Sequence, residues 1–314
     1  AIWRTPIDKP GRYNVYARWV MSKPTDRASN APFTIKSIKG DVTIRVNMKK
    51  RQSAAEYPAG RKQSPWNLLG TFEFKDKAEV ILSNDADNSV VADAVKFEYM
   101  EPIGAVQPEK GKLLYSDDFN TMDNWFIEGS EGKAKTVNGA LQLESTSYKK
   151  GVHAWFRQDL PDSVIIEYDM TVHGPKGFTL VFFSAKGVNG EDIITGLPPR
   201  DGIFNEYVRN PSLLCYHFSI HRVGKGEWAD GANLNKNPGK KLIQRNAVDP
   251  CPPSEGEQTY HITLIKLGGK IQIFVNNKLI LFYIDENSPY KGGKFGFRQI
   301  YLSKVSYDNF RVYK

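Results

Sequence analysis

Residues Tyr260–Ile284, YHITLIKLGGKIQIFVNNKLILFYI, decide the fold of this chain. Three strand-sized apolar segments, Tyr260–Leu267, Lys270–Val275 and Leu279–Ile284, follow one another in this stretch. They are separated by Gly268-Gly269 and by Asn276-Asn277, and such pairs favour the tight turns that join neighbouring antiparallel strands. The stretch therefore predicts two consecutive β-hairpins.

Similar strand-sized segments recur through residues 113–314. β-Branched and aromatic residues fill them, and Gly, Pro, Asn and Asp bound them, as is typical of strands and turns. The further segments are Leu141–Leu143, His153–Arg157, Val164–Val172, Gly177–Ala185, Leu213–Arg222, Lys294–Arg298 and Lys304–Tyr313. They predict two stacked, curved sheets of the jelly-roll type. The long connections at 186–212 and 223–259 are then the expected places for function.

Residues 1–100 show the same alternation on a smaller scale. Tyr13, Val15, Ala17 and Trp19 share one strand face, and the segment from Val42 to Met48 repeats the pattern. A small antiparallel β-sandwich is predicted here. Residues 101–112 contain two prolines and two glycines, which indicates a linker. The chain is therefore predicted to be all-β, with an accessory sandwich at 1–100 and a larger jelly roll at 113–314.

Composition narrows the choice of partner. The 314 residues carry a net charge of +8, which favours a polyanion. Nucleic acid is not expected, because there is no basic helical spacing and no aromatic RNA-binding signature. No apolar run approaches the roughly 20 residues of a membrane-spanning helix. No obligate protein partner is evident.

Two resemblances become specific at this point. Ala1–Tyr99, with GRYNVYARW, ASNAPFTI, SPWNLLGTFEF and VILSNDADNSVVADAVKF, resembles the golvesin C-terminal-like domain of xanthan lyases and other exported bacterial polysaccharide-active proteins. Residues 113–314, with LLYSDDF, GFTLVFFSAKGVNGEDI, CYHFSIHR, NLNKNPGKKLI, DPCPP and GGKFGFRQI, resemble a bacterial family of unknown function with a concanavalin-like jelly-roll fold. The resemblances imply work on carbohydrate and a secreted, periplasmic or cell-surface location, but no settled reaction.

The segment Cys215–Arg222, CYHFSIHR, carries the strongest catalytic pattern. Period-two alternation places His217 and His221 on one face and Phe218 on the other, toward the space between the sheets. Two imidazoles on one face supply a base and an acid near neutral pH. The alternative is a strand face without function.

The predicted binding residues come from other strands and from the loops. His153, Trp155 and Arg157 share a face on which a sugar ring could stack while its carboxylate meets the guanidinium. The remaining predicted substrate contacts are Glu206, Arg209, Asn233, Asn235, Lys236, Asn237 and Arg298. The resembled family commonly has Arg where this chain has Asn235, so one charge for an anionic group is missing here.

The favoured reaction is β-elimination on an acidic, uronate-containing glycan. Arg222 or Arg209, with an Asn, neutralises the uronate carboxylate; His217 or Tyr216 removes the C5 proton; His221 or Tyr216 protonates the leaving oxygen. One alternative is a glycoside hydrolase that uses Glu206, Glu167 or Asp169. Another is a protein that binds glycan without cleaving it.

No metal or cofactor motif is present, and no cofactor is expected. Asp117-Asp118 and Asp308-Asn309 could share a structural Ca²⁺ if the terminal strands pair, although capping of turns by these side chains is favoured. The even cysteine count and the exported setting predict a disulfide between Cys215 and Cys251. Two buried thiols are the alternative.

Overall fold

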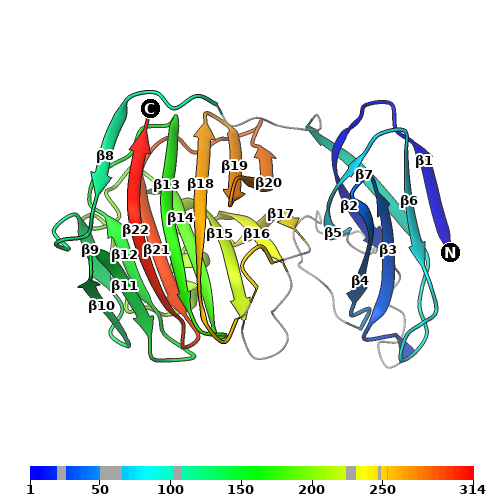
Figure 1. Ribbon diagram of the computed structural model, residues 1–314, viewed down its shortest axis with the longest axis horizontal. Helices are drawn as coiled ribbons and strands as arrows, with labels where there is room; N and C mark the ends of the chain where they lie inside the picture. The colour runs from blue at the N-terminus through cyan, green and yellow to red at the C-terminus, as the bar shows by residue number, and fades with distance from the viewer. Residues whose placement is uncertain (20–25, 50–65, 102–107, 224–230, 247–248, 253) are drawn as a thin grey trace. The chain divides into compact units, whose positions relative to one another are not determined.

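The computed structural model describes residues 1–19, 26–49, 66–101, 108–223, 231–246, 249–252 and 254–314. It divides the chain into two compact units, Ala1–Val106 with Gln244–Ala247, and Gln107–Ile243 with Val248–Lys314 (Figure 1). The linker predicted at 101–112 lies partly outside the described residues. Among the residues described, no helix is long and apolar enough to cross a membrane.

The first unit is built from two small antiparallel sheets. One sheet has the strand order β1-β6-β3-β4 and the other β5-β2-β7. The strands are β1 (Ile2–Pro6), β2 (Gly11–Arg18), β3 (Ala31–Ser37), β4 (Gly40–Val46), β5 (Asn67–Phe74), β6 (Lys77–Leu82) and β7 (Ala94–Glu101). Tyr13, Val15, Ala17 and Trp19 are all buried in its core, which confirms the predicted strand face.

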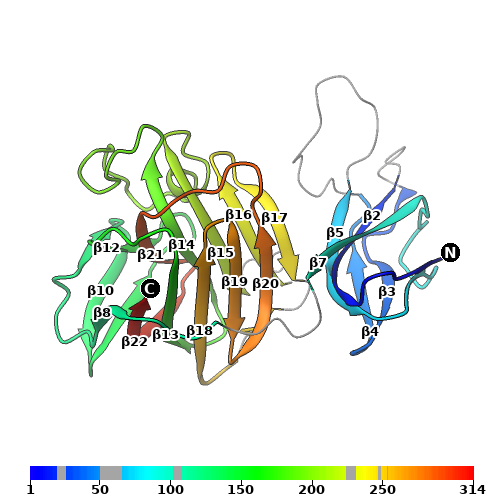
Figure 2. The same cartoon turned by 90° about the horizontal axis from the view of Figure 1, so that it is seen from above.

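The second unit is a jelly roll of two larger sheets, seen as two layers in Figure 2. The eight-stranded sheet has the order β10-β11-β22-β13-β18-β19-β20, with β8 paired to β22. Its strands are β8 (Leu113–Asp117), β10 (Gly132–Val137), β11 (Ala140–Ser145), β13 (Val164–His173), β18 (Glu257–Leu267), β19 (Lys270–Val275), β20 (Lys278–Ile284) and β22 (Lys304–Tyr313). The hairpins predicted from Tyr260–Ile284 are β18-β19-β20, so that prediction is confirmed.

The seven-stranded sheet has the order β17-β16-β15-β14-β21-β12-β9. Its strands are β9 (Trp125–Glu128), β12 (Val152–Phe156), β14 (Gly177–Gly187), β15 (Leu213–Val223), β16 (Ala232–Asn237), β17 (Lys241–Asn246) and β21 (Lys294–Ile300). The main core lies between the two sheets and contains the alternating inner residues of both, such as Phe218, Ile220, Phe297, Ile262 and Tyr307.

Neither long connection is structureless. The predicted loop 186–212 contains the single short helix of the described residues, α1 (Phe204–Val208), and the predicted loop 223–259 contains β16 and β17. The prediction failed for β16 because NLNKN has a single apolar residue, Leu234, and no β-branched residue, so its strand signal is weak.

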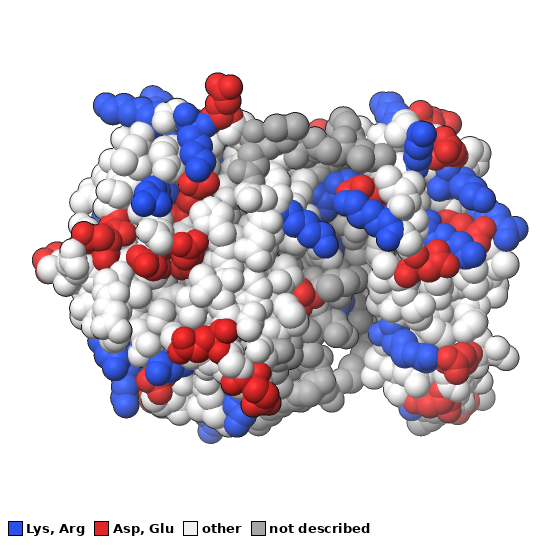
Figure 3. Space-filling model, in the orientation of Figure 1, with Lys and Arg blue, Asp and Glu red and all other residues white. Residues whose placement is uncertain are grey.

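Surface charge is mixed. On the face drawn in Figure 3, Lys and Arg alternate with Asp and Glu and form no continuous basic surface. This mixture agrees with the modest net charge and with the absence of a nucleic-acid signature in the sequence.

Candidate functional site

The candidate site is the outer face of the seven-stranded sheet, the face turned away from the main core. Strand register aligns its residues in two neighbouring rows. They are Glu128, His153, Arg298, Leu180, Ser219 and Asn233 in one row, and Phe126, Trp155, Gly296, Phe182, His217 and Asn235 in the next. The structure therefore brings together His153, Trp155, His217, Asn233, Asn235 and Arg298 from the predicted set.

The connection between β14 and β15, which contains α1, lies over much of this face and is called the cover below. Ile193, Tyr207 and Val208, from the connection that contains α1, pack against Trp155 and Phe182 in a second apolar cluster. His153 and Arg298 consequently have 0% exposure and His217 has 1%. The strand alternation predicted a groove or bulk solvent over the histidines, whereas the structure places them beneath this cover.

Hydrogen bonds hold the cover to the sheet. Arg298 Nη2 donates to the Gly202 carbonyl at 2.7 Å, and Asn237 Nδ2 donates to the Tyr207 carbonyl at 2.6 Å. Arg200 donates to both carboxylate oxygens of Glu128, at 3.0 and 2.7 Å. Polar residues of the site thus bind the backbone of the cover where they could otherwise meet a ligand.

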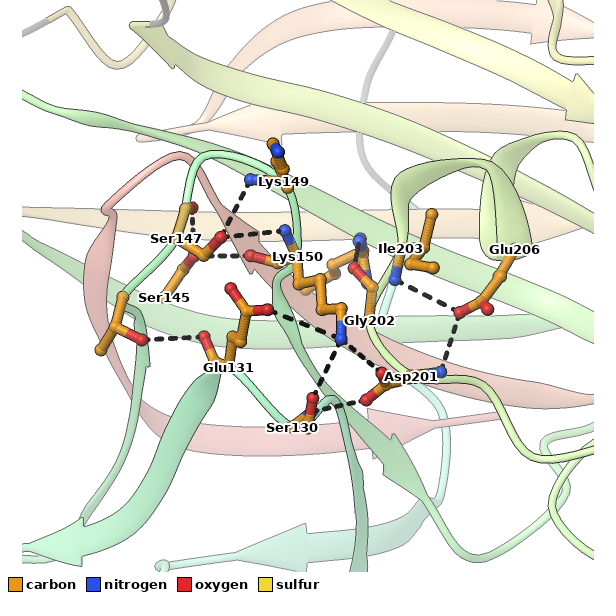
Figure 4. Close-up of polar contacts among 12 residues, drawn as sticks. Ser130, Glu131, Ser145, Ser147, Lys149, Lys150, Asp201, Gly202, Ile203 and Glu206 are labelled. Carbon is orange, nitrogen blue, oxygen red and sulfur yellow. Dashed lines mark hydrogen bonds and ion pairs between the residues drawn. The ribbon is translucent and has the colours of Figure 1, made fainter.

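A further set of contacts fixes the start of α1 at the surface (Figure 4). Lys150 Nζ donates to Asp201 Oδ2 at 2.6 Å, and the Ser130 amide donates to Asp201 Oδ1 at 3.1 Å. These hydrogen bonds, with that from Lys150 foremost, lower the pKa of Asp201 to about 2. Glu206, predicted to bind substrate, accepts the amide hydrogens of Asp201 and Ile203 and so caps the helix.

His153 lies in a stack of rings inside the site. Its ring centroid is 3.8 Å from that of Trp155 and 4.9 Å from that of Tyr207. Arg298 packs on the Tyr207 ring, with its guanidinium carbon 4.1 Å from the ring centroid. Burial, and then the charges of Arg298 and Arg200, hold the pKa of His153 well below its usual value. Its imidazole is therefore neutral.

His217 and Lys240 form the part of the site nearest β16. Burial, followed by the charge of Lys240, lowers the pKa of His217 to about 3. Lys240 lies beside α1, with Nζ 4.9 Å from the Phe204 ring centroid. Burial and the nearby Arg209 and Arg222 lower the pKa of Lys240 to about 8. A lysine with this pKa exchanges a proton near neutral pH.

A β-bulge at the end of β15 changes which of its side chains point to the outer face of the sheet. The register between β14 and β15 shifts so that Ile220 faces Thr179 and Arg222 faces Phe178, which leaves His221 unpaired. Both His221 ring nitrogens lie near backbone carbonyls, those of Cys251 at 3.3 Å and Lys176 at 3.2 Å. Arg222 instead reaches the outer face, 5.5 Å over the Phe178 ring. Simple alternation therefore misplaced His221, because it assumed an unbroken strand.

Tyr216 and Lys236 lie on the inner side of the sheet, away from His217. Both bind Asp285 Oδ2, at 2.5 Å in each case. Arg157 and Arg209 are exposed at the margins of the site, with Arg157 packed 5.5 Å over the Phe126 ring.

Two of the carboxylates predicted for a glycoside hydrolase, Glu167 and Asp169, lie on the outer face of the eight-stranded sheet. Asp169 accepts from His261 Nδ1 and Asn309 Nδ2, each at 2.8 Å, and Glu167 pairs with Lys110 at 2.8 Å. Glu167 and Asp169 are thus bound by neighbours and lie in a different place from the histidine site.

Asp117 serves as a cap. It accepts hydrogen bonds from the Phe119 amide and from Trp125 Nε1, both at 2.8 Å. Strands β8 and β22 do pair, as the calcium hypothesis required. Nevertheless, no group of three or more His, Cys, Asp or Glu in the described part of the chain is arranged to hold a metal ion.

The predicted disulfide is wrong. Cys215 and Cys251 are both buried and free. Cys215 belongs to the outer cluster beneath the cover, whereas Cys251 belongs to the main core between the sheets. The two thiols therefore lie on opposite sides of the seven-stranded sheet.

Fold and site together define a two-unit all-β protein whose larger unit is a jelly roll with a covered polar sheet face. The chain belongs to the family described as "Domain of unknown function (DUF1961)", whose model matches residues 112–312. Residues 1–99 match the Golvesin C-terminal domain.

Individual relatives agree with this assignment. The chain is 29% identical over 217 residues to the uncharacterized protein YesU of Bacillus subtilis (strain 168), covering 66% of this chain and 97% of the relative. A crystal structure from Bacillus subtilis, described as a protein of unknown function with a galectin-like fold, is 28% identical with a TM-score of 0.60, covering 65% and 97% of the two chains. These matches support the same fold, and the two relatives are themselves described as uncharacterized and as of unknown function.

Four residues of the site were not predicted from the sequence: Glu128, Arg200, Tyr207 and Lys240. Glu128 ends a four-residue strand and Arg200 lies in a long connection, so neither had a periodic signal. Lys240 carried a usable signal, because it belongs to the motif NLNKNPGKKLI, which also contains Asn233–Asn237.

Proposed function

We propose that this protein acts on an acidic polysaccharide outside the cell, and that residues 113–314 cleave it by β-elimination at the outer face of the seven-stranded sheet. The observation that carries the proposal is that Arg298, Arg222 and His217 lie on the same outer sheet face, with Lys240 beside α1 at its edge. The Golvesin C-terminal match supports the choice of substrate, because related domains occur on xanthan lyases and other exported polysaccharide-active proteins.

Elimination at a uronate needs three groups. A cation stabilises the negative charge that develops on the carboxylate as the C5 proton is lost. A base takes that proton, the C4–C5 double bond forms, and the C4–O bond breaks. An acid then protonates the leaving glycosidic oxygen. Arg298 supplies the cation, and His217 and Lys240 supply the proton-transfer groups.

The pKa values suit these roles in the presence of an anion. Both His217 and Lys240 are held low by burial and by neighbouring cations. A uronate carboxylate would favour the protonated forms and raise both values. His217 would then approach the range in which imidazole transfers protons efficiently, and Lys240 would be charged as a proton donor.

Binding without cleavage is the second candidate. It is favoured by the burial of His153, His217 and Arg298 beneath α1. A protein that only recognises the glycan could use the margin of the same face, where the exposed Arg209 and the half-buried Asn233 lie.

The test is a screen of acidic polysaccharides for the ultraviolet absorbance of an unsaturated uronate. Arg298→Met should lower turnover by about 10²–10³-fold, the usual effect of removing one preorganised electrostatic group. Arg311→Met is the matched control, because Arg311 is exposed on β22 in the other sheet and should leave turnover unchanged. Binding of the polysaccharide with no absorbance change would support recognition alone, and equal loss in both variants would remove Arg298 from the site.

A further inference from the structure

The covered part of the site contains polar atoms that lack partners. Both ring nitrogens of His153, both of His217, and Nε and Nη1 of Arg298 are buried and make no hydrogen bond within the part of the chain that the structure describes. Buried donors and acceptors are almost always satisfied in native proteins, and a group of exceptions needs an explanation. A missing occupant is one such explanation.

Charge indicates what the occupant would be. Glu128 is fully engaged, because it accepts two hydrogen bonds from Arg200 and one from Trp155 Nε1. Arg298 has no carboxylate within ion-pair distance among the described residues, and its Nη2 donates to the neutral carbonyl of Gly202. A guanidinium fork binds a carboxylate in bidentate geometry.

We propose that Arg298 and His153, which are paired on neighbouring strands, form a subsite for the carboxylate of the ligand. His217 lies two strands from Arg298 beneath the same cover. Residues 201–208 of the cover close this subsite and move away when the ligand enters. The assignment of the ligand as a uronate rests on the proposed function. The subsite and its cover rest on the contacts alone.

The cover has the features of a displaceable element. The Gly202 carbonyl occupies Arg298 Nη2, where a ligand oxygen would bind. The helix has only five residues, and Glu206 caps it at the exposed end of the cover. Burial of Tyr207 and Val208 favours the covered state, whereas the unsatisfied atoms beneath oppose it. The two arrangements are therefore closer in free energy than an ordinary core would allow.

Gly202 gives the means to shift this balance. Its φ is +79°, and a Cβ there would lie 2.3 Å from the Gly151 carbonyl oxygen. Gly202→Ala should therefore push the cover away from the sheet. Gly190→Ala is the matched control, because Gly190 lies in the same connection with φ +89° but its Cβ would meet nothing within 4 Å.

The experiment is modification of the full chain by diethyl pyrocarbonate, with the rate at each histidine read by peptide mapping. In the chain without substitutions, His153 and His217 should react slowly with the reagent. His261, whose side chain is 40% exposed, serves as the reference for an accessible histidine. Gly202→Ala should raise the rates at His153 and His217 by about tenfold or more, which corresponds to ~1.4 kcal/mol, and Gly190→Ala should not. Rates in a folded Gly202→Ala protein that equal those of the original chain would overturn the cover.

Lys150→Ala provides a second route if Gly202→Ala fails to fold. Loss of the partly exposed pair with Asp201 should raise both rates about two- to fivefold. Lys149→Ala removes the same charge from the neighbouring exposed position and should change nothing (Figure 4).

The ligand is tested separately in the Gly202→Ala or Lys150→Ala protein. Oligogalacturonate should restore protection of His153 and His217, whereas maltotriose, which lacks a carboxylate, should not. If neither sugar protects the histidines while the rates stay raised, the result would still support a movable cover but would overturn the carboxylate subsite. Raised rates without any polysaccharide cleavage would count against the proposed function alone.

Discussion

The outer faces of the two jelly-roll sheets carry similar residue types in opposite states. On the eight-stranded sheet, His173 binds Glu257 and Ser306 at 2.6 and 2.7 Å, and His261 binds Asp169 at 2.8 Å. These side chains are partly exposed and satisfied. On the seven-stranded sheet, His153 and His217 are buried, and their ring nitrogens have no hydrogen-bond partners in the described structure.

The comparison shows that residue type alone does not identify a site. Satisfied and solvated polar residues stabilise a strand face, and their replacement is expected to be tolerated. Unsatisfied buried polar residues reduce stability, so their presence is better explained by function than by folding. Three measurements can sharpen or break this distinction.

The largest expected effect is a loss of stability in acid caused by His217. Above pH 6.5 its imidazole is neutral in both the folded and the unfolded chain. Below pH 6.5 the unfolded chain binds a proton that the folded chain does not, because the folded pKa is about 3. The free energy of unfolding should therefore fall by up to ~1.4 kcal/mol per pH unit between these values.

Urea unfolding of the original chain and His217→Leu at pH 7, 5.5 and 4 measures this contribution. The variant should lose less stability in acid than the original chain. Ser219→Ala, which changes a buried neighbour on the same face without removing a titrating group, should keep the original slope. A His217→Leu slope equal to that of the original chain would show that His217 is not held neutral.

A smaller effect is expected from exchanging one histidine on each face for phenylalanine. His153→Phe keeps the stacking with Trp155 and Tyr207 and removes two unsatisfied nitrogens, so it should raise the free energy of unfolding by about 1 kcal/mol. His261→Phe removes a partly exposed pair with Asp169 and should lower it by less than about 1 kcal/mol. Effects of the same sign at pH 7 would erase the distinction between the two faces.

Much of the fold could be predicted from the sequence because alternation is a local signal. It placed Phe218 in the core and His217 on the opposite face. It failed where the local signal ends. The bulge at His221 moves Arg222 to the outer face, and no residue type in CYHFSIHR predicts a bulge at this position.

The cover could not be predicted for a related reason. Its packing joins Tyr207 to Trp155 and Phe182, which are distant in sequence and belong to separate strands. Burial of His153 and His217 depends on that long-range contact. A strand pattern shows which side chains share a face, but it does not show what lies over the face.

The smallest expected effect concerns the two thiols. A disulfide typically contributes 2–4 kcal/mol to stability, but Cys215 and Cys251 are free and separated by the sheet. Addition of a reductant should therefore leave the melting temperature unchanged.

Burial also raises the pKa of both thiols, so neither is a reactive thiolate in the folded protein. A thiol reagent should label neither cysteine in buffer and both in urea without reductant. Labelling of neither in urea would mean that the two cysteines are bonded, which would require the sheet between them to be rearranged.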